Sequence, residues 1–184
     1  MKLLIIALLL TAFAISAMAQ TPTTPTAAAP PVKEANPADV GSIDGIMKAV
    51  YDVISGDAGE KHDWDRFRTL FHKDAKLIPT GKNPQTGVVA ARFLTPEDYI
   101  QRAGPGLEKD GFHERELSRK VEQYGTIAHV FSTYVTFRNK SDKDPFMRGI
   151  NSFQLLNDGK RWWVISIYWL AETPDNPIPA KYLN

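Results

Sequence analysis

RWWVISIYWL, residues 161–170, is the stretch that decides the fold of this chain. Three tryptophans and a tyrosine fall within ten residues, among β-branched residues that favour an extended strand. Apolar side chains occupy both alternating sets: Trp163, Ile165, Ile167 and Trp169 on one, and Trp162, Val164 and Tyr168 on the other. A sheet with one face in water alternates between apolar and polar residues, and this stretch does not. We therefore predict a strand that is covered on both faces.

The segment before this strand completes a hairpin. MRGINSFQLL (147–156) leads into Asn157-Asp158-Gly159-Lys160, and Asp-Gly between two apolar runs is a strong turn signal. A two-residue turn at Asp158-Gly159 fixes the register, which a bulge would shift. The predicted pairs are Leu156 with Arg161, Leu155 with Trp162, Gln154 with Trp163, Phe153 with Val164, Asn151 with Ser166 and Gly149 with Tyr168.

The rest of the chain predicts three helices and four more strands. Apolar spacing and capping residues place helices at 42–56, at 62–75, and from Thr95 to the Gly104-Pro105-Gly106 breaker. Short strands are expected at 75–79 and 88–93, and longer ones at 112–124 and 126–139. Helices followed by an antiparallel meander define an α+β fold class.

This order of elements resembles the NTF2-like superfamily, in its SnoaL-like group. The resemblance covers about residues 43–172 and is carried by the element order and by LFHKDAKL (70–77) and NDGKRWWVI (157–165). It implies a cone in which N-terminal helices pack on a curved, mainly antiparallel sheet. It also implies a cavity between helices and sheet, and often a dimer through the outer sheet face. One function is not implied, because the superfamily holds enzymes, binding modules and transport adaptors.

The first 41 residues predict export. Residues 1–19 combine Lys2, an apolar run and Ala17-Met18-Ala19, the pattern of a cleaved secretory signal peptide. Residues 20–41 form a Pro/Thr/Ala-rich flexible tether, residues 42–174 the NTF2-like domain and residues 175–184 a C-terminal tail. Cysteine is absent, which favours the bacterial periplasm, or secretion without disulfides, as the destination.

Charge narrows the range of partners. The chain has 22 Lys and Arg against 21 Asp and Glu, and removal of Lys2 with the signal peptide leaves 21 of each. A neutral chain gives no electrostatic reason to expect a nucleic-acid partner. The aromatic strand is about half the length of a membrane span, so we expect none after signal removal. Because the aromatic strand is apolar on both faces, a homodimer through the outer sheet face is the expected partner.

Candidate site residues are the polar and aromatic groups expected to face the cone. His72 ends the predicted second helix at the mouth of the cavity and is the one candidate for acid or base chemistry. Glu114 and Glu116 lie in a strand of alternating charges, which is typical of a solvated ladder. Histidine spacing gives no metal motif, and no cofactor-binding motif is present. The predicted ligand-binding residues are Trp64, Phe71, His72, Tyr99, Tyr134, Asn151, Tyr168 and Trp169.

Three functions remain open from the sequence. The leading hypothesis is an exported domain that binds a small apolar molecule in its cone, because the predicted wall is aromatic with few ionisable groups. A second is a cofactor-free isomerase or dehydratase that uses His72 as acid or base. The third is a non-catalytic scaffold that binds other proteins through its outer face.

Overall fold

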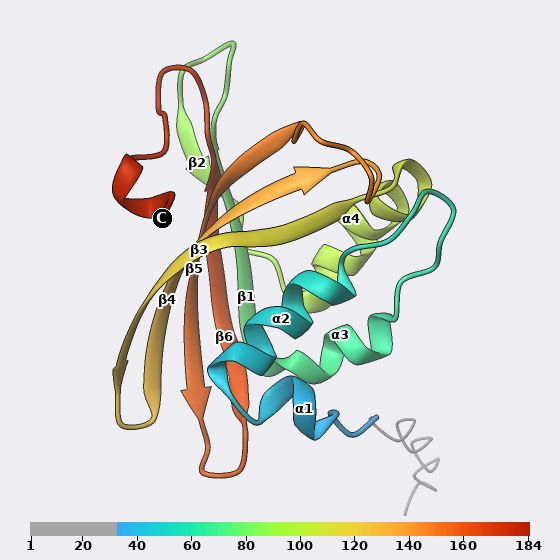
Figure 1. Ribbon diagram of the computed structural model, residues 1–184, viewed down its shortest axis with the longest axis vertical. Helices are drawn as coiled ribbons and strands as arrows, with labels where there is room; N and C mark the ends of the chain where they lie inside the picture. The colour runs from blue at the N-terminus through green and yellow to red at the C-terminus, as the bar shows by residue number, and fades with distance from the viewer. Residues whose placement is uncertain (1–32) are drawn as a thin grey trace, which may run out of the picture. The chain divides into compact units, whose positions relative to one another are not determined.

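The computed structural model describes residues 33–184 (Figure 1). The predicted signal peptide and residues 20–32 of the predicted tether lie outside the described residues. The elements are α1 (Pro37–Val40), α2 (Ile43–Val53), α3 (Trp64–Leu70), β1 (Phe71–Lys82), β2 (Val89–Ala91), α4 (Pro96–Asp110), β3 (His113–Tyr124), β4 (Ile127–Phe137), β5 (Met147–Asn157), β6 (Trp162–Ala171) and the 3-10 turn η1 (Ala180–Tyr182).

The strands form one curved sheet in the order β2-β1-β6-β5-β4-β3. Strands β3 to β6 are the predicted antiparallel meander, and β1 joins it by pairing parallel to β6. Figure 1 shows α2, α3 and α4 on the concave side of this sheet and η1 on the other side. The predicted α+β fold class, with N-terminal helices on a curved sheet, is confirmed.

The hydrophobic core lies between the helices and the concave face of the sheet. Helices start where their caps were expected, because Ser42, Asp63 and Thr95 each accept a hydrogen bond from a backbone N–H of the first turn. The side chains at the centre of the core are fully buried, and they are Ile46 and Met47 of α2, Phe67 and Leu70 of α3, Val130 of β4, Phe153 of β5 and Val164 of β6.

The predicted hairpin register is wrong. Leu156 pairs with Trp163 and Leu155 with Val164, two residues away from the expected partners. The cause is the side chain of Asp158, which accepts hydrogen bonds from Lys160 N (2.8 Å), Arg161 N (2.9 Å) and Trp163 Nε1 (2.8 Å). These bonds stabilise a four-residue loop in place of a two-residue turn.

A β-bulge in β6 also changes which side chains face the core. The register shifts between Leu155, which pairs with Val164, and Gln154, which pairs with Ser166, so Ile165 is the extra residue. Trp162 and Val164 are buried before the bulge, and Ile167 is buried after it. The predicted division into two constant faces therefore holds only as far as Val164. After the bulge Trp169 turns inward, and Tyr168 is 51% exposed on the outer face.

Two helix ends differ from their predicted positions. Helix α3 ends at Leu70, so Phe71 and His72 begin β1 and do not continue the helix. Helix α4 runs through Pro105 to Asp110, past the predicted breaker. Its last turn is held by Glu108, whose carboxylate accepts from Trp64 Nε1 at 3.0 Å and whose backbone carbonyl accepts from Gly59 N at 2.6 Å. These contacts offset the backbone hydrogen bond that proline removes.

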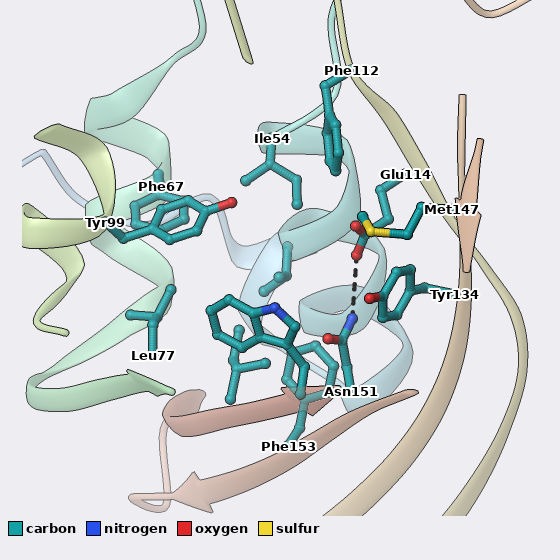
Figure 2. Close-up of a pocket in the computed structure, with 13 residues that line it drawn as sticks. Ile54, Phe67, Leu77, Tyr99, Phe112, Glu114, Tyr134, Met147, Asn151 and Phe153 are labelled. Atoms are coloured by element: carbon teal, nitrogen blue, oxygen red, sulfur yellow. Dashed lines mark hydrogen bonds between the residues drawn. The ribbon is translucent and has the colours of Figure 1, made fainter. Parts of the chain in front are cut away.

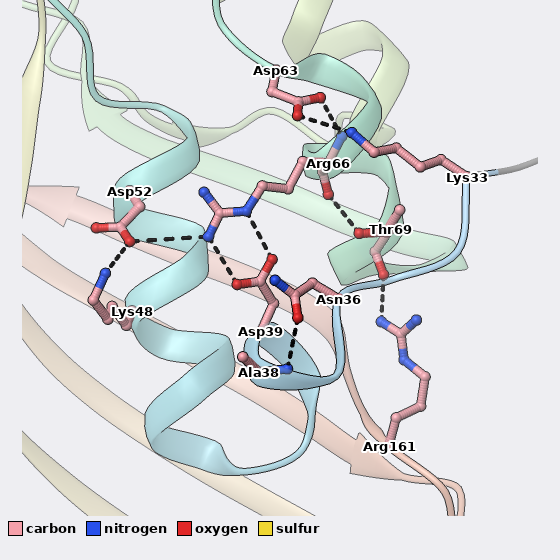
Figure 3. A network of polar contacts seen from close by, with 10 residues as sticks. All are labelled: Lys33, Asn36, Ala38, Asp39, Lys48, Asp52, Asp63, Arg66, Thr69 and Arg161. Carbon is pink, nitrogen blue, oxygen red and sulfur yellow. Dashed lines mark hydrogen bonds and ion pairs between the residues drawn. The ribbon is translucent and has the colours of Figure 1, made fainter.

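Residues before the expected domain boundary at residue 42 contact the helices of the domain. Asn36 caps α1, and the buried Asp39 accepts two hydrogen bonds from the Arg66 guanidinium, at 2.7 and 2.9 Å (Figure 3). The Arg66 hydrogen bond lowers the pKa of Asp39. A bidentate pair of this kind attaches α1 to α3. Lys33 adds a second link to α3 through Asp63, at 3.0 Å.

The predicted C-terminal tail packs on the outer face of the sheet. The carbonyl oxygen of Tyr182 accepts hydrogen bonds from Ser118 Oγ (2.5 Å) and Thr133 Oγ1 (2.6 Å). The Tyr182 ring packs on Phe131, with 5.0 Å between ring centroids. Part of the apolar outer face is therefore covered by the chain itself.

Gly149 of β5 provides a test of how tightly the cone is packed. A Cβ atom there would lie 2.5 Å from the carbonyl oxygen of Leu170 and 2.5 Å from the hydroxyl of Tyr134. We expect Gly149→Ala to lower the free energy of unfolding by about 3 kcal/mol, because overpacking displaces backbone and ring together. Urea denaturation measures this value.

Gly81→Ala is the matched control, since it also lies in a strand of this sheet and nothing is within 4 Å of the added atom. We expect a change of less than about 1 kcal/mol. Equal destabilisation by the two substitutions would contradict the described packing around Gly149.

Candidate functional site

A cavity of about 100 Å³ opens between the helices and the concave face of the sheet (Figure 2). Most of its wall is apolar, and its polar groups come from α4, β3, β4 and β5. The lining residues are Val50, Ile54, Phe67, Leu77, Tyr99, Phe112, Glu114, Tyr134, Met147, Asn151, Phe153, Ile167 and Trp169.

Glu114 is the acidic residue in this lining. Its backbone is held by Ser55, just past the end of α2: Glu114 N donates to Ser55 Oγ at 2.9 Å, and that hydroxyl shares its hydrogen between Tyr51 O at 2.7 Å and Glu114 O at 3.2 Å. Its carboxylate oxygen Oε1 accepts a hydrogen bond of 3.2 Å from Asn151 Nδ2 of β5. Figure 2 shows the carboxyl group between Met147, Tyr134 and Asn151.

The surroundings of Glu114 favour its neutral form. Burial raises the pKa of Glu114 from 4.5 to about 8, and the hydrogen bond from Asn151 opposes only part of this rise. The lining contains no lysine, arginine or histidine whose charge could stabilise the carboxylate. At pH 7 the group is therefore mostly a carboxylic acid, which can donate a hydrogen bond as well as accept one.

Two tyrosine hydroxyls share the cavity with Glu114. Burial raises the pKa of Tyr99 and of Tyr134, and the nearby Glu114 raises both further, so both phenols stay protonated. The Tyr99 ring is stacked on Phe67 at 5.6 Å and meets Trp169 edge-on at 6.4 Å. Within residues 33–184 neither hydroxyl has a hydrogen-bond partner. Both are therefore available to a bound molecule.

This set of groups has a defined chemical capacity. A neutral carboxyl group and two phenols supply hydrogen-bond donors to an acceptor in a mostly apolar space. A carboxyl group with a pKa near 8 can also give up or take up a proton near neutral pH. No three histidine, aspartate or glutamate side chains gather into a metal-binding group within residues 33–184.

Four of the eight predicted ligand-binding residues line the cavity: Tyr99, Tyr134, Asn151 and Trp169. The other four do not. Trp64 packs beneath α4, where its Nε1 donates to Glu108, and Phe71 lies behind the cavity, 4.5 Å from the Phe67 ring. Tyr168 faces outward because of the bulge in β6.

His72 does not line the cavity, so its expected position at the mouth is wrong. It is the second residue of β1, where strand geometry replaces the helix that we expected there. Its ring is partly exposed, meets Trp163 edge-on at 6.1 Å and lies 3.8 Å from Asp74. This environment gives it no access to a molecule in the cone.

Glu114 is the ionisable lining residue that is not among the predicted ligand-binding residues. Strand β3 alternates acidic and basic residues, and this pattern was interpreted as a solvated ladder. One signal was present: Phe112 precedes Glu114 by two residues, so the two share a face if the extended chain begins at Phe112. Phe112 is buried, which places Glu114 at the cavity.

Comparison with known proteins supports the fold. No family model matches the chain, and no curated protein matches it. A protein of unknown function with a cystatin-like fold from Nostoc punctiforme is 13% identical, covers 77% of this chain and 97% of its own, and has a TM-score of 0.53.

Two further solved structures are similar. The chain named as the beta subunit of an aromatic-ring-hydroxylating dioxygenase from Novosphingobium aromaticivorans is 19% identical, covers 75% of this chain and 95% of its own, and has a TM-score of 0.53. An NTF2-like protein of unknown function from Shewanella baltica is 18% identical, covers 71% of this chain and 91% of its own, and has a TM-score of 0.45. The fold is NTF2-like, and at these identities the similarity shows the fold alone.

No helix within residues 33–184 is long and apolar enough to cross a membrane.

The acid in the cavity predicts how stability depends on pH. Because the folded pKa of Glu114 is raised, the folded state keeps a proton that the unfolded chain releases above about pH 4.5. The free energy of unfolding should therefore fall as pH rises from about 4.5 to 8. We expect Glu114→Gln to remove this fall and to be about 5 kcal/mol more stable than the wild type at pH 9, because each pKa unit of the shift corresponds to about 1.4 kcal/mol.

Urea denaturation at a series of pH values checks this. Glu122→Gln is the control, because the Glu122 side chain is 85% exposed; we expect it to keep the wild-type slope. A wild-type slope in Glu114→Gln would show that Glu114 is not the acid with the raised pKa.

Proposed function

We propose that this chain binds a small, mostly apolar molecule that carries a carbonyl oxygen. The observation that supports this most directly is the neutral Glu114 carboxyl in an apolar cavity beside the hydroxyls of Tyr99 and Tyr134. A carbonyl oxygen accepts such hydrogen bonds, whereas an anion would find no lysine, arginine or histidine in the lining to balance its charge. The cavity volume of about 100 Å³ is below that of drug-sized sites, so the molecule is small.

A second candidate is proton-transfer catalysis without a cofactor, of the isomerase or dehydratase kind. The pKa of about 8 favours this candidate, because an acid or base works best when its pKa is near the working pH. In this version the carboxylate form of Glu114, and not His72, takes a proton from the carbon next to the carbonyl group, and the resulting carboxylic acid returns a proton to carbon. Tyr99 and Tyr134 donate hydrogen bonds to the oxygen on which negative charge develops.

We also propose export and self-association, which rest on other features. Export is supported by the sequence of residues 1–19 alone. A dimer through the outer face is supported by the apolar side chains exposed there, such as Tyr168 and Leu170, which the C-terminal segment leaves 51% and 43% accessible. The alternative is that the chain is a non-catalytic scaffold and that another protein binds this face.

Binding can be tested with cyclohexanone as a probe and cyclohexane as its apolar match. We expect cyclohexanone to shift the NMR signals of the Asn151 side-chain amide, and cyclohexane to bind more weakly. Tyr134→Phe should weaken cyclohexanone binding about fivefold, because one hydrogen bond contributes about 1 kcal/mol. Tyr168→Phe, on the outer face, is the control and should bind like the wild type. Equal affinity in the two variants would contradict the proposed site.

Catalysis is tested separately, by hydrogen exchange at the carbons next to the carbonyl group. In D₂O the protein should accelerate exchange of the α-hydrogens of cyclohexanone, measured by the loss of their proton NMR signal. Glu114→Gln should lower this rate at least a hundredfold, the usual contribution of a general base, whereas Glu122→Gln should not. An unaccelerated rate with intact binding would leave the chain a binding protein.

A further inference from the structure

A chain of hydrogen bonds leads away from the Glu114 carboxyl into the sheet. Asn151 Nδ2 donates both to Glu114 Oε1 and to the Tyr51 hydroxyl, each at 3.2 Å. The Tyr51 hydroxyl lies 2.7 Å from Ser132 Oγ, and Ser132 Oγ donates to Glu116 Oε1 at 2.6 Å. Tyr51, Ser132 and Asn151 are all buried.

This series of hydrogen bonds ends at an ion pair between Glu116 and Arg119. Arg119 Nε lies 2.9 Å from Glu116 Oε2, and Arg119 also approaches Asp44 at the start of α2, at 3.2 Å. The guanidinium can only donate hydrogen bonds, so Glu116 accepts from it on Oε2 and accepts from Ser132 on Oε1. Glu116 is therefore the hydrogen-bond acceptor at this end of the series.

The number of hydrogens on each group determines which group donates in each of these hydrogen bonds. Ser132 has one hydroxyl hydrogen, and it must go to the Glu116 carboxylate. Ser132 then accepts from Tyr51, which has no hydrogen left for Asn151. Asn151 must therefore present its NH₂ group, and not its oxygen, toward Tyr51 and toward Glu114.

We propose that Glu116 is a positioning residue for the cavity acid. Acting through Ser132 and Tyr51, it orients the Asn151 amide so that Glu114 Oε1 accepts a hydrogen bond and Glu114 carries its proton on Oε2. The proton that would meet a ligand is thus fixed on one oxygen by a residue that does not line the cavity. The inference deepens the proposed function and rests on it for its chemical use.

The groups around Glu114 come from every element packed against it. Tyr51 is on α2, Tyr99 on α4, Tyr134 on β4 and Asn151 on β5. The three tyrosines stay neutral, since burial raises the pKa of each. Near neutral pH these tyrosines therefore do not change their charge. Glu116 can then affect Glu114 only through the orientation of the Asn151 amide.

The test is a titration of the Glu114 side-chain carbon by NMR in the full chain without ligand. Ser132→Ala removes the acceptor of Tyr51, which becomes free to donate to the Asn151 oxygen. The amide then turns, and the carboxylate form of Glu114 loses its donor. We expect the titration midpoint of Glu114 to rise by about one pH unit, a tenfold change in proton affinity. The Asn151 amide signals should also stop following that titration.

Glu116→Gln is the second variant, and it serves if Ser132→Ala does not fold. Its neutral amide can donate to Ser132, so the direction of the chain is no longer fixed, and we expect the same upward change. Ser152→Ala is the control: its hydroxyl is in the same sheet but bonds His129, at 3.0 Å, and we expect the wild-type midpoint.

An unchanged midpoint in both test variants would overturn the inference. A change in Ser132→Ala without a change in Glu116→Gln would also overturn it, because the effect would then belong to Ser132 alone. The titration uses no ligand, so a failure of cyclohexanone to bind would contradict the proposed function and leave this result intact.

Discussion

The desolvation of one carboxyl group is the constraint on which the site depends. An isolated carboxylate in an apolar space has a high desolvation free energy. A protein avoids it by placing a cation beside the carboxylate or by keeping the group protonated. The cavity lining supplies no cation, and Asn151 offers a single hydrogen bond of 3.2 Å to Glu114. The protonated form of Glu114 is therefore favoured. The chemistry of the cavity follows from that neutral acid.

The fold supplies the space in which this happens. A curved sheet alone leaves its concave face open, and helices α2, α3 and α4 close it with apolar side chains. The bulge at Ile165 then turns Trp169 into the wall, and Gly149 leaves room for the Tyr134 ring. Small departures from regular strand geometry therefore decide which polar groups reach the acid.

Much of the fold could be predicted from the sequence because its signals are local. Aromatic and β-branched runs gave the strands of the meander, and Ser42, Asp63 and Thr95 marked helix starts through the hydrogen bonds they accept. The bulge at Ile165 could not be predicted, since both faces of that strand are apolar and either register buries similar side chains. A longer second helix was predicted because FHKDA (71–75) also fits helical spacing.

The site was only half predictable for a related reason. Tyr99, Tyr134 and Asn151 were found because each is a polar group within an apolar pattern. Glu114 was not, since its neighbours in the sequence are charged and its apolar surroundings come from other elements. Placing an acid in a cavity requires knowledge of what packs across from it, and no local pattern carries that information.

Neutron diffraction from a crystal exchanged into D₂O at pH 7 tests the central claim most directly. We expect a deuteron on Glu114 Oε2, with the ND₂ group of Asn151 directed at Oε1. A Glu114 carboxylate without a deuteron would contradict it, because the cavity would then hold a charge that its lining does not balance.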